Sequence, residues 1–207
     1  MHVRPMTPAG VVDHLVDLIA SRSEDRVRVL VDGHPSTRPE ELADRLVDPL
    51  RVRGRPVVRV RATDFLRPAS VRLEHGRTDV DAFYDQVDVQ ALAREVLDPW
   101  SSGGRGRYLP SLWDARVDRA TREPARDVPA GGILVVDGSL LLGRWLEFDL
   151  TVHLALGPAG LDRRTPAQQA WTLPAYARYT DDVRPEAVAD VVVRADDAKR
   201  PALVLPD

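Results

Sequence analysis

The residues from Arg26 to Leu46 have the spacing of a phosphate-binding turn. A β-branched run at 27–31 ends in Asp32-Gly33, a polar loop follows, and a helical pattern opens at Pro39. A strand, a glycine turn and the start of a helix together cradle phosphate in many α/β proteins, because the first N–H groups of a helix are free to donate. The chemistry that this spacing indicates is phosphate binding.

Two aspartates follow apolar runs elsewhere in the chain. Asp64 comes after a strand-like run at 57–61, and Asp137 closes the most apolar run, 132–136. Ligands of open α/β sheets bind at the carboxyl ends of the strands, so both carboxylates are placed for a site. Each also has a plainer role, Asp64 as a helix cap or turn residue and Asp137 in an Asp-Gly turn. The residues alone leave both roles open.

Apolar strands and amphipathic helices alternate through the rest of the chain, which predicts a parallel sheet covered on both faces. We expect a three-layer α/β/α fold with a mainly parallel five-stranded sheet, forming one domain over 1–207. Its core runs over 26–194. The segments 67–85 and 101–131 lack long regular elements, and we expect a functional loop and a hairpin-like cover there. The expected strands are 27–31, 57–61, 132–136, 149–156 and 188–194. The expected helices are 8–22, 39–53 and about 87–97. We expect the region about 158–187 to be helical but broken at Pro166 and Pro174, and the final dozen residues to be a tail.

Composition excludes several classes of function. The chain has 207 residues, no cysteine and a net charge of −3, so thiolate catalysis, zinc–thiolate sites and general binding to nucleic-acid polymers are not expected. The five histidines show no metal-ligand spacing, and His153, inside a strand, fits a satisfied core histidine. No run is long and apolar enough for a membrane span or a signal core, so we expect a cytoplasmic protein.

Four motifs in order resemble the uridine-kinase-like P-loop phosphotransferases, the branch that includes phosphoribulokinase and pantothenate kinase. They are VDG with its loop and helix at 31–46, TDFLRP at 63–68, DAFYD at 81–85 and ILVVDG at 133–138. The passage RPEAVADVVV at 184–193 extends the resemblance over nearly the whole chain. It implies a P-loop NTPase-like fold and, in an active member, transfer of phosphate from ATP or GTP with Mg²⁺ to a nucleoside or another small hydroxyl compound.

The phosphate loop departs from the family pattern G-x-x-x-x-G-K-S/T. Counted from Gly33, the second glycine is Arg38, the lysine is Pro39 and the magnesium-binding hydroxyl is Glu40. Arg38 disfavours a left-handed backbone, and Pro39 removes both an ammonium group and an N–H donor. At about 4 Å from a phosphate, the carboxylate of Glu40 would cost roughly 1–4 kcal/mol. We therefore expect impaired ATP turnover, and the use of no cofactor stays open, as does replacement of the lysine by Arg38.

The resemblance also assigns roles to individual residues. Asp64 matches the general base that takes the proton of the attacking hydroxyl, and Asp137 matches the acidic residue that helps hold magnesium. Core packing is the alternative for Phe83, and a solvated surface is the alternative for Arg67 and Arg77. The cofactor-binding residues would be Gly33, His34, Ser36, Thr37, Arg38, Arg163 and Arg164, the last two at the start of a short lid; the substrate-binding residues would be Phe65, Arg67, Arg77, Phe83 and Tyr84.

Two functions follow from these patterns. The first is a uridine-kinase-like phosphotransferase with a degenerate phosphate-binding loop. The second is a non-catalytic descendant that binds a nucleoside or nucleotide, or regulates through it. Both have a small-molecule partner, neither needs a nucleic-acid polymer or a membrane, and the sequence leaves a homo-oligomer open.

Overall fold

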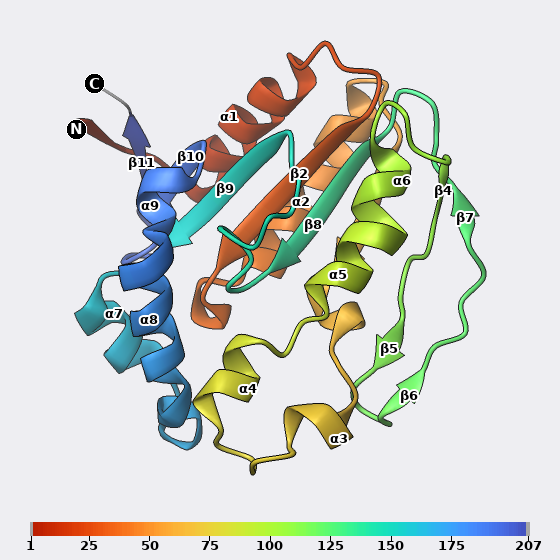
Figure 1. Ribbon diagram of the computed structural model, residues 1–207. Coiled ribbons are helices and arrows are strands. Elements are labelled where there is room, and N and C mark those ends of the chain that lie inside the picture. The colour runs from red at the N-terminus through yellow and green to blue at the C-terminus, as the bar shows by residue number, and fades with distance from the viewer. Residues whose placement is uncertain (1, 206–207) are drawn as a thin grey trace.

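A seven-stranded sheet forms the centre of the molecule in the computed structural model, which describes residues 2–205 (Figure 1). The five expected strands are all present and form its parallel part, in the order β10-β9-β2-β8-β3. The expected mainly parallel sheet is therefore confirmed. The strands are β1 (His2–Pro5), β2 (Val27–Gly33), β3 (Val57–Arg61), β8 (Ile133–Gly138), β9 (Leu150–Ala155), β10 (Val191–Arg194) and β11 (Ala202–Leu205).

The expected strand count of five was wrong, because two short strands extend the sheet beyond β10. β11 pairs antiparallel with β10, and β1 pairs antiparallel with β11. The final residues are therefore not simply a tail. Each added strand has only four residues, which is too short for an alternating pattern to stand out from a loop.

Helices cover both faces of the sheet and confirm the three-layer arrangement (Figure 1). The helices α1 (Pro8–Ala20) and α2 (Pro39–Val52) bury their apolar residues against one face. The other face is covered mainly by α5 (Val89–Leu92), the π-helical turn η3 (Ala93–Leu97), α6 (Asp98–Trp100) and α8 (Leu173–Val183).

Local sequence explains where the two helices beside the loop begin. Thr7 caps α1, its hydroxyl oxygen accepting a hydrogen bond from Gly10 N at 3.0 Å. Pro39 is the first residue of α2, where its missing N–H costs nothing, and Glu40 and Glu41 follow at the positive end of the helix. The loop before α2 is thus held between a buried strand and a well-formed helix start.

The segments 101–131 and 67–85, which lack long regular elements, form different kinds of structure. The 101–131 segment forms two short antiparallel ladders: β4 (Arg107–Tyr108) with β7 (Arg126–Asp127), and β5 (Trp113–Asp114) with β6 (Arg119–Ala120). The segment 67–85 contains the short helices α3 (Ala69–Arg72) and α4 (Val80–Tyr84). The broken region about 158–187 is helical as expected, with α7 (Pro158–Arg164), the 3-10 turn η4 (Ala167–Thr172), α8 and α9 (Pro185–Val188).

The helices within residues 2–205 are all too short, or too polar, to cross a lipid bilayer.

Candidate ligand site at the carboxyl edge of the sheet

The phosphate-loop frame is present between β2 and α2. Gly33 ends the strand, the 3-10 turn η1 (Pro35–Thr37) follows, and α2 begins at Pro39. A Cβ on Gly33 would lie 2.7 Å from Thr37 Oγ1 and 2.9 Å from Leu154 Cβ, closer than such atoms approach. This position therefore requires glycine because of the close approach of the loop and β9.

Three N–H donors of the loop are used within the loop itself. Ser36 N donates to His34 Nδ1 at 3.1 Å, Thr37 N to the His34 carbonyl oxygen at 2.8 Å, and Arg38 N to the Pro35 carbonyl oxygen at 3.0 Å. A phosphate cradle instead leaves such groups pointing at the ligand. Pro39 supplies no N–H at all. Polyphosphate binding here would need these bonds to break.

Arg38 adopts the left-handed conformation of the glycine that it replaces. Its φ and ψ are 57° and 59°, a region that costs a residue with a Cβ roughly 1–2 kcal/mol. Its guanidinium pairs with Glu41 at 2.9 Å on the exposed surface, one turn into α2. The backbone of the loop thus keeps its shape, while the side chain is engaged with its own helix.

His34 fills the space between the loop and the helix α8. Its imidazole is buried and packs edge-on against Tyr176 of α8, with ring centroids 4.3 Å apart. Burial lowers the pKa of His34 to about 4, so the ring is neutral at pH 7. A neutral ring offers no positive charge to a phosphate.

Asp137 lies at the carboxyl end of β8, as expected, and it is already paired. Arg59 of β3 reaches it at 2.6 Å and also contacts Asp44 at 3.0 Å. Burial raises the pKa of Asp137, and the charge of Arg59 opposes that shift. Sequence reasoning missed Arg59, because only the pairing of β3 with β8 brings it to this carboxylate.

Asp64 lies in the 3-10 turn η2 (Ala62–Phe65) that follows β3, and its side chain is half-buried. Burial raises the pKa of Asp64, Arg61 opposes the shift, and the nearby charges of Asp137 and Asp114 add to it. The Asp64 carbonyl accepts a hydrogen bond from Leu112 N at 2.9 Å, which ties the turn to the β5–β6 ladder. Asp114 could not be found from the sequence, because that ladder is 50 residues further along the chain.

Only some of the residues expected to bind the substrate lie close together. Phe65 has no exposed surface and belongs to the core. Phe83 packs edge-on against Trp171 and Tyr176, with centroids 5.4 and 6.0 Å away. Tyr84 is buried beneath two guanidinium groups, those of Arg144 at 5.1 Å and Arg178 at 4.5 Å. Arg67 is partly buried beside this cluster, with its N–H bonded to the Gln86 carbonyl at 2.9 Å, and Arg77 is exposed between α3 and α4.

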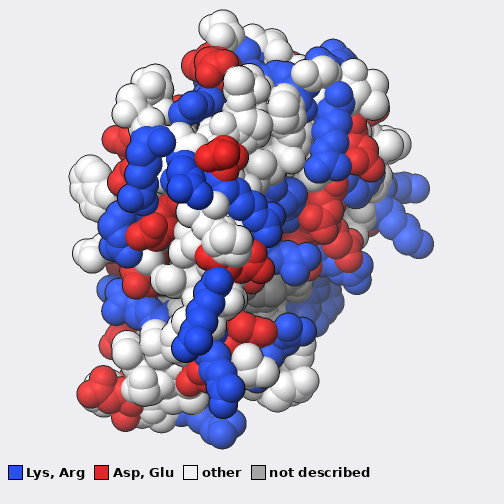
Figure 2. Space-filling model, turned by 90° about the vertical axis from the view of Figure 1, so that its right-hand side faces the viewer, with Lys and Arg blue, Asp and Glu red and all other residues white. Residues whose placement is uncertain are grey.

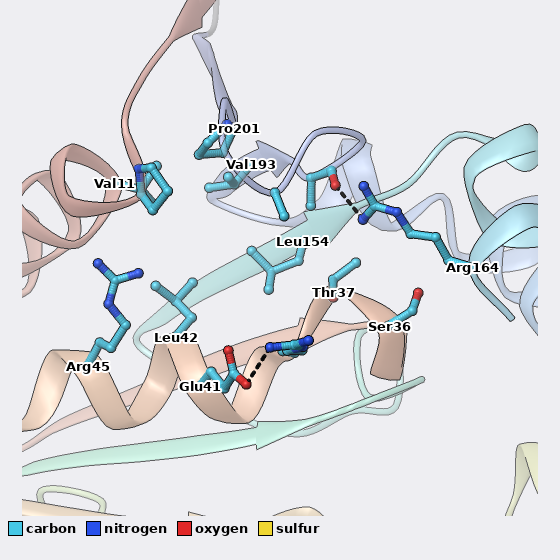
Figure 3. Close-up of a pocket in the computed structure, with 14 residues that line it drawn as sticks. Val11, Ser36, Thr37, Glu41, Leu42, Arg45, Leu154, Arg164, Val193 and Pro201 are labelled. Atoms are coloured by element: carbon cyan, nitrogen blue, oxygen red, sulfur yellow. Dashed lines mark hydrogen bonds and ion pairs between the residues drawn. The ribbon is translucent and has the colours of Figure 1, made fainter. Parts of the chain in front are cut away.

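A groove of about 630 Å³ runs along the outer side of the loop, between α1, α2 and the segment 195–201 (Figure 3). Figure 3 shows Leu42 and Leu154 between the guanidinium groups of Arg45 and Arg164. Arg164 donates to the Ala195 carbonyl at 2.8 Å and to that of Asp196. Ser36, Thr37 and Arg38 also line this groove, whereas Arg163 is exposed outside it. Apolar walls with cationic ends suit a ligand that has a flat ring and an anionic group.

A fully buried carboxylate lies directly before the loop. Asp32 accepts hydrogen bonds from Leu141 N at 3.0 Å, from Tyr179 OH at 3.1 Å and from His153 Nδ1 at 2.8 Å. Tyr179 OH accepts in turn from Leu142 N at 2.9 Å. His153 is therefore the satisfied core histidine that the sequence indicated. The sequence pattern predicts Asp32 only as the end of a strand and indicates no role for its carboxylate.

The residues do not fit ATP with Mg²⁺ in the usual phosphate-loop arrangement. The loop N–H groups are bonded internally, the lysine position is proline, and Asp137 is held by Arg59. Among the residues that the structure describes, no three histidine or acidic side chains are grouped to hold a metal ion.

Comparison with solved structures gives the fold. A possible uridine kinase from Bacillus stearothermophilus superposes with a TM-score of 0.72 at 20% identity, over 87% of this chain and 96% of that one. The YGR205w protein superposes with a TM-score of 0.61 at 10% identity, over 95% and 99% of the two chains. No family model and no curated protein matches the sequence. The chain has the fold of the uridine-kinase-like P-loop phosphotransferases.

Proposed function

We propose that this protein binds a nucleotide or nucleoside in the groove beside the loop 33–38 and does not transfer phosphate from ATP through that loop. One observation carries the proposal. The N–H groups of Ser36, Thr37 and Arg38 all donate to acceptors inside the loop. A polyphosphate would have to displace these bonds and would then meet Glu40 in place of a magnesium-binding hydroxyl.

The groove supports the ligand class. Leu42, Leu154 and Val193 offer apolar contact to a base, and the guanidinium group of Arg45 lies where a phosphate could pair with it, while that of Arg164 adds positive charge from its place against the Ala195 and Asp196 carbonyls. Binding of this kind uses side-chain cations in place of a metal ion. The proposal therefore includes affinity that does not depend on Mg²⁺.

Calorimetry tests this directly with uridine, UMP, ATP and GTP, each titrated with Mg²⁺ and with EDTA. We expect at least one of these ligands to bind with the same affinity in both buffers, and no phosphorylated nucleoside to form on incubation with ATP and Mg²⁺. Failure of all four ligands to bind would overturn the proposal.

A phosphotransferase acting on a nucleoside or another small hydroxyl compound is the second candidate. Asp64 favours it, because a half-buried carboxylate with a raised pKa at the carboxyl edge of the sheet suits a general base. Under this candidate a nucleoside panel with ATP and Mg²⁺ yields product, and Asp64→Asn abolishes the turnover. The exposed Asp81→Asn variant is the matched control and would keep it.

A further inference from the structure

A second, much smaller cavity lies on the other side of the loop, between the ends of β2 and β9 and the helix α8. Its volume is about 30 Å³, and Leu154 lies between it and the larger groove. Five of its lining side chains are polar and buried: Asp32, His34, His153, Tyr176 and Tyr179. Neither proposed function uses these groups.

Hydrogen bonding fixes the proton on His153. Leu141 N and Tyr179 OH both donate to Asp32, and the Tyr179 hydroxyl proton is free to do so because its oxygen accepts from Leu142 N. Asp32 is thus a carboxylate that accepts from every partner, so the hydrogen between it and His153 belongs to His153 Nδ1. In the neutral ring the remaining nitrogen, Nε2, carries a lone pair and is an acceptor.

His34 has the opposite tautomer. Its Nδ1 accepts from Ser36 N at 3.1 Å, and therefore the proton of this neutral ring is on Nε2. Nε2 lies 3.4 Å from Thr165 Oγ1, which is longer than a usual N–H···O bond of about 2.7–3.2 Å. The donor can therefore serve a closer oxygen as well.

Tyr176 supplies the third polar group. The residue is only 5% exposed, and its hydroxyl has no partner at good hydrogen-bond geometry within residues 2–205, although the Ser139 hydroxyl lies close enough to oppose the rise in the Tyr176 pKa that burial causes. The nearby Ser139 hydroxyl donates to the Gly33 carbonyl. A buried hydroxyl without a well-placed partner is unfavourable, so a partner at this position is favoured.

We infer that this cavity is a subsite for one hydroxyl oxygen, supplied by water or by the hydroxyl group of a small ligand. His34, Tyr176 and His153 line the cavity, and in this inference His34 Nε2–H and Tyr176 O–H are the two donors and His153 Nε2 is the acceptor. A hydroxyl group matches that set, since its oxygen accepts two hydrogen bonds and its proton is donated once. The volume also suits a single oxygen. His153, backed by the Asp32 carboxylate, would polarise the hydroxyl that it accepts from.

This subsite is independent of nucleotide binding in the larger groove, and removal of the Tyr176 hydroxyl tests it. We expect Tyr176→Phe to lower the Tm by about 2–4 °C, because the bound oxygen loses a donor. Tyr179→Phe is the comparison, since the Tyr179 hydroxyl has two protein partners. An unchanged or raised Tm in Tyr176→Phe, with a lowered Tm in Tyr179→Phe, would overturn the inference.

Two measurements on the unmodified chain do not depend on a variant folding. Nitrogen-15 NMR should show His153 protonated at Nδ1 and His34 at Nε2 at neutral pH; the same tautomer in both rings contradicts the inference. A high-resolution crystal structure should show density within hydrogen-bonding distance of Tyr176 OH and His153 Nε2. An isolated peak identifies water, continuous density identifies a ligand hydroxyl, and the lack of density in this cavity overturns the inference.

Discussion

Arg38 shows how a single residue can keep a backbone shape while losing its chemistry. It occupies the glycine position of the loop with φ 57° and ψ 59°. The left-handed conformation is disfavoured for arginine, and the protein retains it because β2 and α2 on either side fix where the loop must start and end.

Glycine at this position should stabilise the protein. We expect Arg38→Gly to raise the free energy of unfolding by about 0.5–1 kcal/mol, since relief of the left-handed strain exceeds the added flexibility of the unfolded chain. Urea denaturation measures this. Arg184, with φ 53°, is a matched control, and Arg184→Gly should show a gain of similar size. A loss of stability in Arg38→Gly alone would mean that its pair with Glu41 outweighs the strain.

The buried His34 should make stability depend on pH. Its folded pKa is about 4, below the ordinary value of 6.5, so the unfolded chain binds a proton more readily between these values. The contribution of His34 is fully present above pH 6.5 and is lost as the pH falls toward 4, by up to about 3 kcal/mol.

Urea denaturation from pH 7 to pH 4 checks the effect by comparing the wild type with His34→Gln. The raised pKa values of Asp64 and Asp137 act in the opposite direction, and the comparison cancels them because both proteins carry these residues. We expect the wild type to lose more stability than the variant over this range. Equal losses would show that His34 titrates normally.

At the level of secondary-structure elements, the strand, loop and helix form even though the residues that bind phosphate in the family pattern are replaced. The triple variant Arg38→Gly, Pro39→Lys and Glu40→Ser restores the glycine, the ammonium group, the N–H donor and the hydroxyl together. Because the frame is already formed, we expect the variant to gain Mg²⁺-dependent ATP binding that the wild type lacks, measured by calorimetry.

The control for this experiment is the single variant Glu40→Ser, which removes the charge of Glu40 and leaves proline at the position of the lysine. We expect little gain from it. If the triple variant also fails to bind ATP, the internal bonds of His34 with Ser36 and Thr37 are strong enough by themselves to keep the cradle closed.

The elements differ in how well their sequence predicts them. Four of the parallel strands, β2, β8, β9 and β10, are largely buried and apolar, and β3, at the edge of the sheet, alternates valine with arginine, so all five could be predicted. β1 and β11 could not, because each has only four residues and is defined by the strands that it pairs with. The helices α3 and α4 have only four or five residues and were hidden in a polar segment.

At the scale of the whole molecule, the larger groove is assembled from distant parts of the chain. Val11 of α1, Leu42 of α2 and Pro201 before β11 meet around it (Figure 3). The surface around the fold carries both signs of charge. Figure 2 shows Lys and Arg side chains intermingled with Asp and Glu over one face, in keeping with the net charge of −3.

Filling the groove should prevent ligand binding without unfolding the protein. Ala198 lines the groove and is exposed, so Ala198→Trp should leave the Tm nearly unchanged. We expect it to weaken the nucleotide or nucleoside affinity at least about tenfold, a loss of about 1.4 kcal/mol, by steric exclusion. Ala187→Trp, at an exposed position of α9 away from the groove, is the control. Equal affinity of both variants would place the ligand elsewhere.

The strand–loop–helix frame and the parallel core could be predicted from the sequence alone, and the departure of Arg38, Pro39 and Glu40 from the phosphate-loop pattern stays a prediction from it. These follow from local residue type and from apolar patterns, which are legible along the chain. Only the tertiary structure decided that Arg59 holds Asp137, that Asp114 lies near Asp64, and that Asp32, His153, His34 and Tyr176 enclose one small cavity. Arg59 and Asp137, Asp64 and Asp114, and Asp32 and His153 lie far apart in the chain, and only strand pairing and loop packing bring the members of each pair together.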